Sequence, residues 1–229
     1  MPKVVIITGA SKGIGKSCAE LFLKNKYIVI NASRSDSKPI KNSNYHFIKT
    51  NVASERDVKK LTEKVIDDFG KIDVLICSAG FGKFAKLSDS RTKDFDEMFA
   101  VNVRGLYFCN RFAVNAMLKE KNGTIINISS VSGKNGIATA SIYSATKHAV
   151  IGLSSSLMAE VRKDNIRVVT ICPGSVDTNF FDDPSAILNS RRDTILSPDD
   201  VAKVCLLSAE LPQNALINEV EIRPLNPHK

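Results

Sequence analysis

The sequence is poor in the residues from which metal and redox centres are built. Its 229 residues include no tryptophan and only three histidines, which lie far apart at positions 46, 148 and 228. This separation gives no metal-ligand spacing, so we expect no metal site. The five cysteines, at positions 18, 77, 109, 172 and 205, lack the paired spacing of a zinc site or a redox couple. We expect them to be buried free thiols.

Long hydrophobic runs are also absent. No stretch approaches the roughly 18 apolar residues of a membrane span, and the first residues carry neither the cationic segment nor the cleavage site of an export signal. Together with the free thiols, this predicts a cytoplasmic protein without a membrane partner.

Positive charge is in excess but is not concentrated. The chain has 32 Lys and Arg residues against 24 Asp and Glu residues, a net charge of +8. These basic residues are scattered and no aromatic platform is interleaved with them, so the sequence does not favour a nucleic-acid partner. A solvated, lysine-rich surface is the default interpretation.

Short β-branched runs alternate with longer segments of helical periodicity. We predict strands at residues 4–8, 27–31, 46–49, 74–77, 124–128, 167–171 and 220–222, and helices at 14–24, 55–69, 95–119, 143–161 and 198–209. Nearly all the strands are continuously apolar, and the connections are long enough for crossover helices. We therefore predict an α/β fold with a single domain over residues 1–229: a Rossmann-like, doubly wound parallel sheet of about seven strands with helices on both faces.

A glycine-rich turn follows the first predicted strand and opens the first predicted helix. It reads Thr-Gly-Ala-Ser-Lys-Gly-Ile-Gly over residues 8–15. Glycine permits a tight turn and a close approach of the backbone to a pyrophosphate, while free amides at a helix N-terminus supply positive potential. The turn predicts a dinucleotide site, with contacts from Gly9, Ser11, Lys12, Gly13, Ile14 and Gly15.

The residues after the second predicted strand favour NADP(H) over NAD(H). They contain no Asp or Glu where a carboxylate would bind a ribose 2′-hydroxyl. Arg34 instead follows Ser33, and Lys12 lies in the glycine turn. Two cations and a hydroxyl in these places would suit a 2′-phosphate.

Four further motifs appear in a fixed order along the chain. They are Phe-Ala-Val-Asn-Val at 99–103, Ile-Ser-Ser at 128–130, Tyr-Ser-Ala-Thr-Lys at 143–147 and Pro-Gly-Ser-Val-Asp-Thr at 173–178. With the glycine turn they are highly specific, and the sequence strongly resembles the short-chain dehydrogenase/reductase family, in its classical form, over nearly its whole length. The resemblance implies catalytic roles for Asn102, Ser130, Tyr143 and Lys147, and cofactor contacts from Asn51, Val52, Ala79, Gly80, Tyr143, Lys147, Pro173, Gly174, Val176 and Thr178.

The residue types at these positions also make chemical sense. Tyr143 and Lys147 stand four residues apart on a predicted helix, so both side chains project from one face. We expect the ammonium group, together with an oxidised nicotinamide, to lower the pKa of the phenol so that Tyr143 acts as a general acid or base. By resemblance, the Ser130 hydroxyl would hydrogen-bond a substrate oxygen, and Asn102 would hold a water on a proton path from Lys147 to solvent.

Two further expectations rest on the resemblance. Helices 95–119 and 143–161 resemble those that pair across the family's dimer axis, which implies a homodimer or homotetramer. Where the family usually has Asn-Asn-Ala-Gly after the fourth strand, this chain has Cys-Ser-Ala-Gly at 77–80, so a side chain that braces the backbone is replaced.

We therefore expect an NADP(H)-dependent enzyme that transfers a hydride between the nicotinamide and a small carbonyl, hydroxy acid or sugar-like substrate. Loops 81–87, 132–142 and 179–192 should set the substrate. The last loop carries apolar residues beside two cations, which would suit a carboxylated or phosphorylated substrate: Phe180, Phe181, Ile187, Leu188, Arg191 and Arg192.

Two alternatives stay open. One is a 3-oxoacyl-[acyl-carrier-protein] reductase, for which Arg104 and Arg111 would supply basic residues beside the pocket mouth, although the C-terminus lacks the glycine-rich ending common among such enzymes. The other is a regulator that senses NADP(H) without turnover, and the intact catalytic set argues against it.

Overall fold

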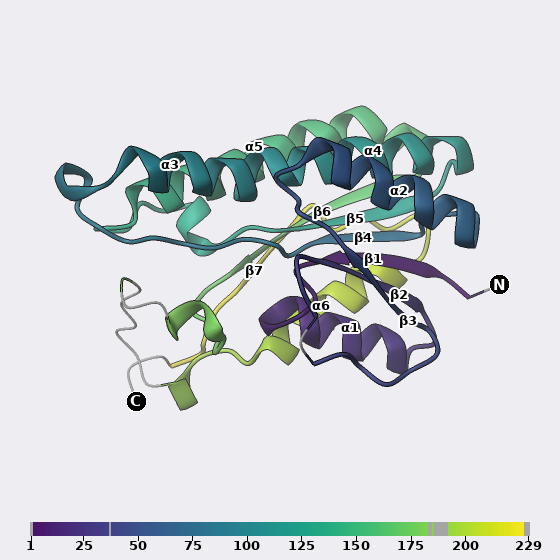
Figure 1. Ribbon diagram of the computed structural model, residues 1–229, viewed down its shortest axis with the longest axis horizontal. Coiled ribbons are helices and arrows are strands. Elements are labelled where there is room, and N and C mark those ends of the chain that lie inside the picture. The colour runs from purple at the N-terminus through teal and green to yellow at the C-terminus, as the bar shows by residue number, and fades with distance from the viewer. Residues whose placement is uncertain (1, 37, 183–184, 186–191, 227–229) are drawn as a thin grey trace.

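Seven parallel strands form one sheet in the computed structural model, which describes residues 2–36, 38–182, 185 and 192–226 (Figure 1). They are β1 (Val4–Thr8), β2 (Ile28–Ser33), β3 (Tyr45–Lys49), β4 (Val74–Cys77), β5 (Gly123–Ile128), β6 (Ile166–Pro173) and β7 (Glu219–Ile222). The spatial order is β3-β2-β1-β4-β5-β6-β7, so the order reverses between β1 and β4. Ligands of such sheets bind outside the carboxyl ends of the strands near this reversal.

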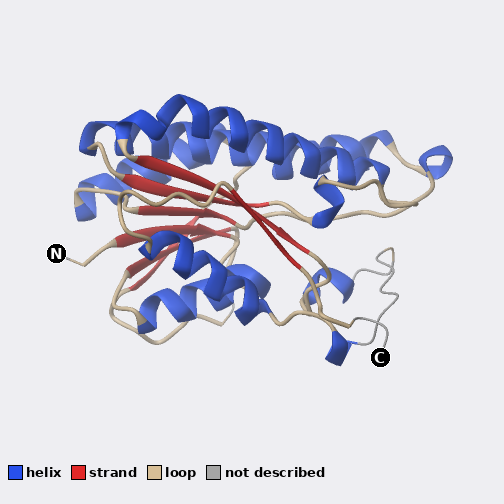
Figure 2. Cartoon of the chain, turned by 180° about the vertical axis from the view of Figure 1, so that it is seen from behind, coloured by secondary structure: helices blue, strands red, loops and turns tan. Residues whose placement is uncertain are grey.

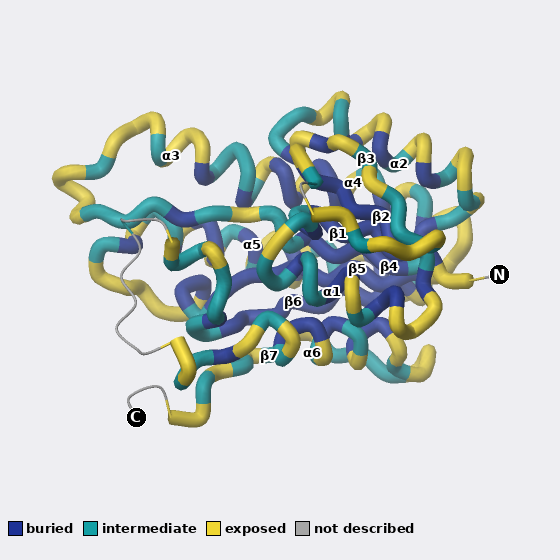
Figure 3. The backbone as a smooth tube through the Cα atoms, turned by 60° about the horizontal axis from the view of Figure 1, so that its bottom comes forward, coloured by how far each residue is buried: buried dark blue, intermediate teal, exposed yellow. Residues whose placement is uncertain are grey.

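Helices cover both faces of the sheet, as predicted (Figure 2). The main helices are α1 (Gly13–Lys24), α2 (Glu55–Phe69), α3 (Thr92–Met98), α4 (Leu106–Glu120), α5 (Ser141–Val161) and α6 (Pro198–Glu210). Phe22 of α1 and Val201 of α6 belong to the core on one face, and Val58 of α2 and Val150 of α5 to the core on the other. The central strands β1, β2, β4, β5 and β6 are buried almost throughout, as the tube in Figure 3 shows, whereas the edge strands β3 and β7 are partly exposed.

The prediction of a single α-helix over residues 95–119 is wrong in detail. The chain there forms α3, then a π-helical segment at Phe99–Gly105, then α4. A π-helical segment is rare and often marks a functional site, and this one carries Asn102. Where other element ends differ from prediction, they differ by one or two residues, because ends depend on caps and backbone hydrogen bonds rather than on apolar periodicity.

The cysteine prediction is confirmed. All five cysteines are free thiols and all are buried. Within the part of the chain that the structure describes, no helix combines the length and the apolar character needed to cross a membrane.

Candidate active site

A cavity of about 490 Å³ lies at the carboxyl edge of the sheet. Ser130, from the segment after β5, lines it together with Tyr143 and Lys147, which both come from α5. The same cavity is lined by eight members of the predicted cofactor set: Ile14, Gly80, Tyr143, Lys147, Pro173, Gly174, Val176 and Thr178. The structure therefore brings three of the four catalytic candidates together with much of the cofactor set.

The glycine turn between β1 and α1 has a backbone that only glycine accommodates. Gly9 has a φ of +72°, and a Cβ there would lie 2.9 Å from the Cα of Ala79. A Cβ on Gly15 would collide with the carbonyl oxygen of Gly9. Lys12 stands at the N-cap of α1 without a side-chain cap, so the first-turn amides are left for a ligand. This bare turn fits the pyrophosphate of a dinucleotide.

Thr8 is a site residue that the sequence motif contained but whose role was not foreseen. Its buried Oγ1 accepts hydrogen bonds from the amides of Ser78 and Ala79, both at 3.1 Å. These bonds join the end of β1 to the loop after β4, across the point where strand order reverses. Thr8 thus braces the backbone at which Cys77 and Ser78 replace the usual asparagines.

The side chain of Asn102 holds the loop after β4 in place. Its Oδ1 accepts from the Phe81 amide at 3.1 Å, and its Nδ2 donates to the Phe81 carbonyl at 2.8 Å and to Thr146 Oγ1 at 3.2 Å. Asn102 is 2% exposed and does not line the cavity. Its amide is engaged by Phe81 and Thr146, a bracing role that no motif revealed.

The hydroxyls of Ser130 and Tyr143 share the cavity. Burial raises the pKa of Tyr143 to about 12, and a hydrogen bond with Ser130 opposes this rise. We expected Lys147 together with an oxidised nicotinamide to lower the pKa of the phenol, whereas the chain's own residues alone raise it. The reason is that the phenol lies among apolar groups, which disfavour the phenolate.

Lys147 is a buried cation placed between the strand end and the phenol. Its Nζ donates to the Ile128 carbonyl at 3.0 Å and lies 5.7 Å from the centroid of the Tyr143 ring. Burial lowers the pKa of Lys147 from 10.5 to about 8. The ammonium group is therefore easier to deprotonate than that of an exposed lysine, and it does not offset the desolvation of the phenol.

The structure corrects one expectation at the end of β2. Ser33 is buried, and its Oγ donates to Asn31 Oδ1 at 2.6 Å, so its proton is not available for a 2′-phosphate. Asn31 in turn donates to the Tyr45 hydroxyl at 2.8 Å, which donates to Asp36 at 2.8 Å. Arg34 and Lys12 are both exposed at this edge, where a phosphate could reach them.

The two residues expected against the adenine differ in their surroundings. Val52 is buried in the core, and its side chain lies so close to Gly105 that a Cβ there would be 2.9 Å from its Cγ2. Asn51 is exposed, and its Oδ1 accepts from the Ala53 amide at 3.1 Å. Both follow β3 at the same carboxyl edge as the other cofactor residues.

All three loops predicted to set the substrate reach the cavity. Phe81 and Phe84 come from the first, Ile137 from the second, and Phe180 and Phe181 from the third. Of the other residues predicted for the third loop, Ile187, Leu188 and Arg191 lie outside the described residues.

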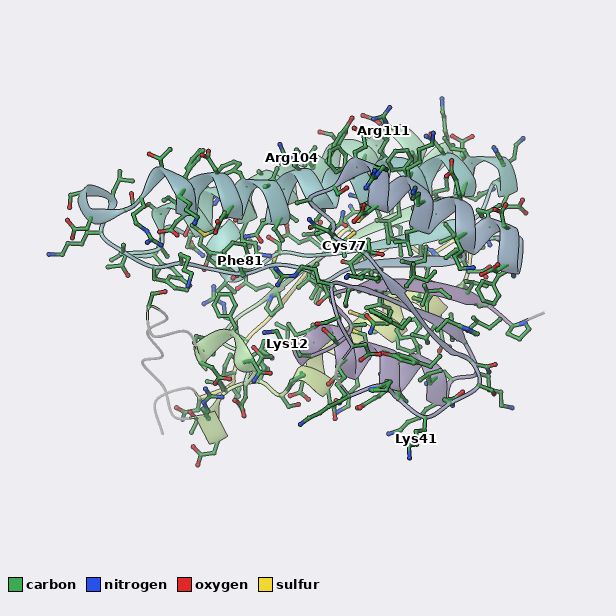
Figure 4. The ribbon with its side chains drawn as sticks, viewed as in Figure 1. Lys12, Lys41, Cys77, Phe81, Arg104 and Arg111 are labelled. Atoms are coloured by element: carbon green, nitrogen blue, oxygen red, sulfur yellow. The ribbon has the colours of Figure 1, made fainter. Side chains whose placement is uncertain are left out.

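Three arginines do not lie where we expected. Arg192 forms ion pairs with Asp177 at 2.9 Å and with Asp182 at 2.7 Å, so its charge is engaged by residues of the chain itself. Arg111 pairs with Glu55 at 2.8 Å. Arg104 and Arg111 lie on the outer side of the helical layer, and neither lines the cavity, whereas Lys12 and Phe81 lie toward the carboxyl edge (Figure 4).

Comparison with known proteins agrees with this geometry. The family model for short chain dehydrogenases matches residues 3–186. An uncharacterized oxidoreductase of Staphylococcus aureus strain USA300 is 31% identical, with 97% of each chain covered. The chain therefore belongs to the short-chain dehydrogenase family and is an oxidoreductase of that family.

Solved structures extend the comparison. ElxO with NADP bound is 31% identical, covers 96% of this chain and 98% of its own, and superposes with a TM-score of 0.86. The 3-ketoacyl-(acyl-carrier-protein) reductase of Brucella melitensis, complexed with NADH, is 25% identical over 98% of each chain with a TM-score of 0.90. Nicotinamide dinucleotides are thus bound by proteins of the same fold and similar length.

Proposed function

We propose that this protein is an NADP(H)-dependent oxidoreductase that reduces a carbonyl compound, or oxidises the matching alcohol, with Tyr143 as general acid and base. The observation that carries the proposal is that one cavity is lined both by the catalytic candidates Ser130, Tyr143 and Lys147 and by Ile14 of the glycine turn and Thr178, which lies beside that turn. A proton donor and a dinucleotide site in one cavity are what hydride transfer to a carbonyl requires.

The chain's own residues would handle the proton and the substrate oxygen. The raised pKa of Tyr143, about 12, keeps the phenol protonated near neutral pH, so that it donates to a carbonyl oxygen. Ser130 would hydrogen-bond the same oxygen as negative charge develops there. Lys147 places a buried cation beside the phenol and favours its ionised form once the proton has left. A bound nicotinamide supplies or accepts the hydride.

Arg34 and Lys12 are the residues proposed to select NADP(H). Both are exposed cations, one at the end of β2 and one in the glycine turn, and a 2′-phosphate between them would make charge-assisted hydrogen bonds. ElxO, at 31% identity, has been solved with NADP bound, which supports the same cofactor here. The segment after β2 offers Ser33 and Arg34 rather than an acid.

The test is a titration of the nicotinamide fluorescence of NADPH and NADH, which the absence of tryptophan simplifies. Arg34→Ala should weaken NADPH binding by about tenfold or more, because a hydrogen bond to a charged group contributes roughly 1.5–3 kcal/mol, and should leave NADH binding nearly unchanged. Lys41→Ala is the matched control, since this exposed lysine lies away from Lys12 (Figure 4).

Turnover is tested separately. Tyr143→Phe should bind NADPH as the wild type does but should lose carbonyl reduction. An equal loss of affinity for NADPH and NADH in Arg34→Ala would contradict the assignment of NADP(H) as the cofactor. Carbonyl reduction by Tyr143→Phe would contradict the role of the phenol as proton donor. Binding without any turnover in the wild type would favour a sensor instead.

Reduction of acyl-carrier-protein substrates is less well supported. Its basic docking residues were expected to be Arg104 and Arg111, but Arg111 pairs with Glu55 and neither arginine lines the cavity. A pulldown with an acylated carrier protein tests this alternative directly.

We further propose a single-domain protein that acts in the cytoplasm as a homodimer or homotetramer. Tyr107 of α4 and Leu153 of α5 are 43% and 36% exposed, so these helices present apolar side chains at the surface. Burial of such groups would stabilise pairing of the helices between two copies. Light scattering after size-exclusion chromatography measures the assembly, and Leu153→Glu should shift it toward the monomer.

A further inference from the structure

The aromatic rings of Phe84, Tyr143 and Phe180 lie together in the lining of the cavity, and we call them the aromatic wall. The centroid of the Phe84 ring lies 5.6 Å from that of the Tyr143 ring and 5.7 Å from that of the Phe180 ring. The centroids of the Tyr143 and Phe180 rings are 5.5 Å apart. They come from the loop after β4, from α5 and from the segment Asn179–Asp182. Rings at these separations attract one another, so the wall is a packed unit built around the phenol.

Gly82 sets the position of two of these rings. A Cβ at Gly82 would lie 2.8 Å from the Cζ of Phe180 and 2.8 Å from the Cζ of Phe84, so the bare backbone is in contact with both ring tips. The amide of Phe84 also donates to Ser185 Oγ at 3.3 Å. These contacts fix the wall beside the place where a carbonyl oxygen would meet the phenol.

The described charged groups next to the cavity residues Val176, Thr178 and Phe181 are engaged with one another. Both Asp177 and Asp182 bind the guanidinium of Arg192, at 2.9 and 2.7 Å. Among the described lining residues, Lys147 alone carries a cationic side chain, and it donates to the Ile128 carbonyl. The described lining thus offers no uncommitted cation to a carboxylate or phosphate on the substrate, and burial of such a group against phenyl rings is unfavourable.

We infer that the cavity takes an uncharged carbonyl compound whose carbonyl carbon bears an aromatic or bulky apolar group, and that Phe84 and Phe180 set this specificity. The inference rests on the proposed function, since it places the carbonyl oxygen at Tyr143 and Ser130. The apolar group then packs on rings that already contact the phenol, which removes apolar surface from water at the reacting end of the substrate. The alternative is the anionic substrate expected from the sequence, for which Arg191 lies outside the described residues.

Three ketones test the inference: acetophenone, 4-acetylbenzoate and butanone. They share a methyl ketone, while the first two differ by one carboxylate and the first and third by the phenyl group. We measure kcat/KM with NADPH, and binding by saturation-transfer NMR in the presence of NADP. Acetophenone should exceed 4-acetylbenzoate by at least about tenfold, because an unpaired buried carboxylate is costly.

Substitutions in the wall separate specificity from catalysis. Phe180→Leu and Phe84→Leu should each lower kcat/KM for acetophenone about fivefold more than kcat/KM for butanone, which is the scale of one lost aromatic contact. Gly82→Ala displaces the rings of Phe84 and Phe180 without removing either. It should therefore lower the ratio of kcat/KM for acetophenone to kcat/KM for butanone. Phe47→Leu is the matched control, because this phenylalanine is 42% exposed on β3.

The outcomes are distinguishable. Preference for 4-acetylbenzoate, or an equal loss for acetophenone and butanone in Phe180→Leu and Phe84→Leu, overturns the inference and leaves the proposed function intact. Failure to reduce any of the three ketones counts against the proposed function. In that case the relative binding of acetophenone and 4-acetylbenzoate by NMR still tests which kind of group binds at the aromatic wall.

Discussion

Lys147 should make the protein less stable at neutral pH than it would be with an apolar residue at this position. The side chain is 7% exposed and lies among apolar groups with one hydrogen bond, to the Ile128 carbonyl. Burial lowers its pKa from 10.5 to about 8. Below pH 8 the folded protein must hold a desolvated ammonium group, whereas the unfolded chain holds the same group in water.

The size and sign of the effect follow from the two pKa values. Between pH 8 and 10.5 the unfolded chain binds the proton more tightly than the folded protein, so stability rises with pH across this window. The complete shift corresponds to about 3 kcal/mol, of which about 2 kcal/mol is gained between about pH 7 and 9.5. Cys172 stays neutral over this range, because burial raises the pKa of its thiol to about 11.

The measurement compares urea unfolding of the wild type and Lys147→Met, followed by far-UV circular dichroism at several pH values. Subtracting the two profiles removes groups that titrate in both proteins. Lys147→Met should be the more stable protein at pH 7, and its advantage should shrink by about 2 kcal/mol by about pH 9.5. Lys41→Met controls for the loss of one positive charge at an exposed site. A difference that does not change with pH would refute the reasoning.

Two further substitutions test the supports of the site, and a third is a control. Thr8→Val should lower the free energy of unfolding by about 2 kcal/mol or more, measured by urea unfolding, because the amides of Ser78 and Ala79 lose their acceptor. Gly9→Ala should weaken NADPH binding in a fluorescence titration and cost at least about 1 kcal/mol, since its φ is +72° and its Cβ would approach Ala79. Ser197→Ala removes the capping box of α6 and should cost about 1 kcal/mol of stability without changing NADPH affinity, so it controls for Gly9→Ala.

The sequence predicts the sheet and the main helices well because their signals are local. The bounds of β1, β4 and α2 coincide with the predicted ones, since each is a periodic or apolar run between turn-forming residues. The cavity residues Ser130, Tyr143 and Lys147 are equally predictable, because a family motif fixes their spacing and topology brings the strand ends together.

The roles of individual side chains are harder to predict, because they depend on which partner each side chain contacts in the folded protein. Ser33 reads as a ligand for a phosphate, but its hydroxyl proton binds Asn31 two residues earlier. Arg192 reads as a cation for the substrate, but it binds Asp177, which lies 15 residues away. Phe84 and Phe180 meet although almost a hundred residues separate them, and no periodic pattern connects two loops.

The opposite pKa shifts of Tyr143 and Lys147 have one cause, and it bears on the direction of the proposed reaction. Burial in the same cavity favours the neutral form of each, so it raises the pKa of the phenol to about 12 and lowers that of the ammonium group to about 8. Reduction of a carbonyl requires a protonated phenol, which is the form that the chain's own residues favour at neutral pH. Oxidation requires a phenolate, which needs additional positive charge beside the ring. Phe84 and Phe180 pack against the Tyr143 ring, so the residues proposed to select an apolar substrate also help to keep water from the phenol.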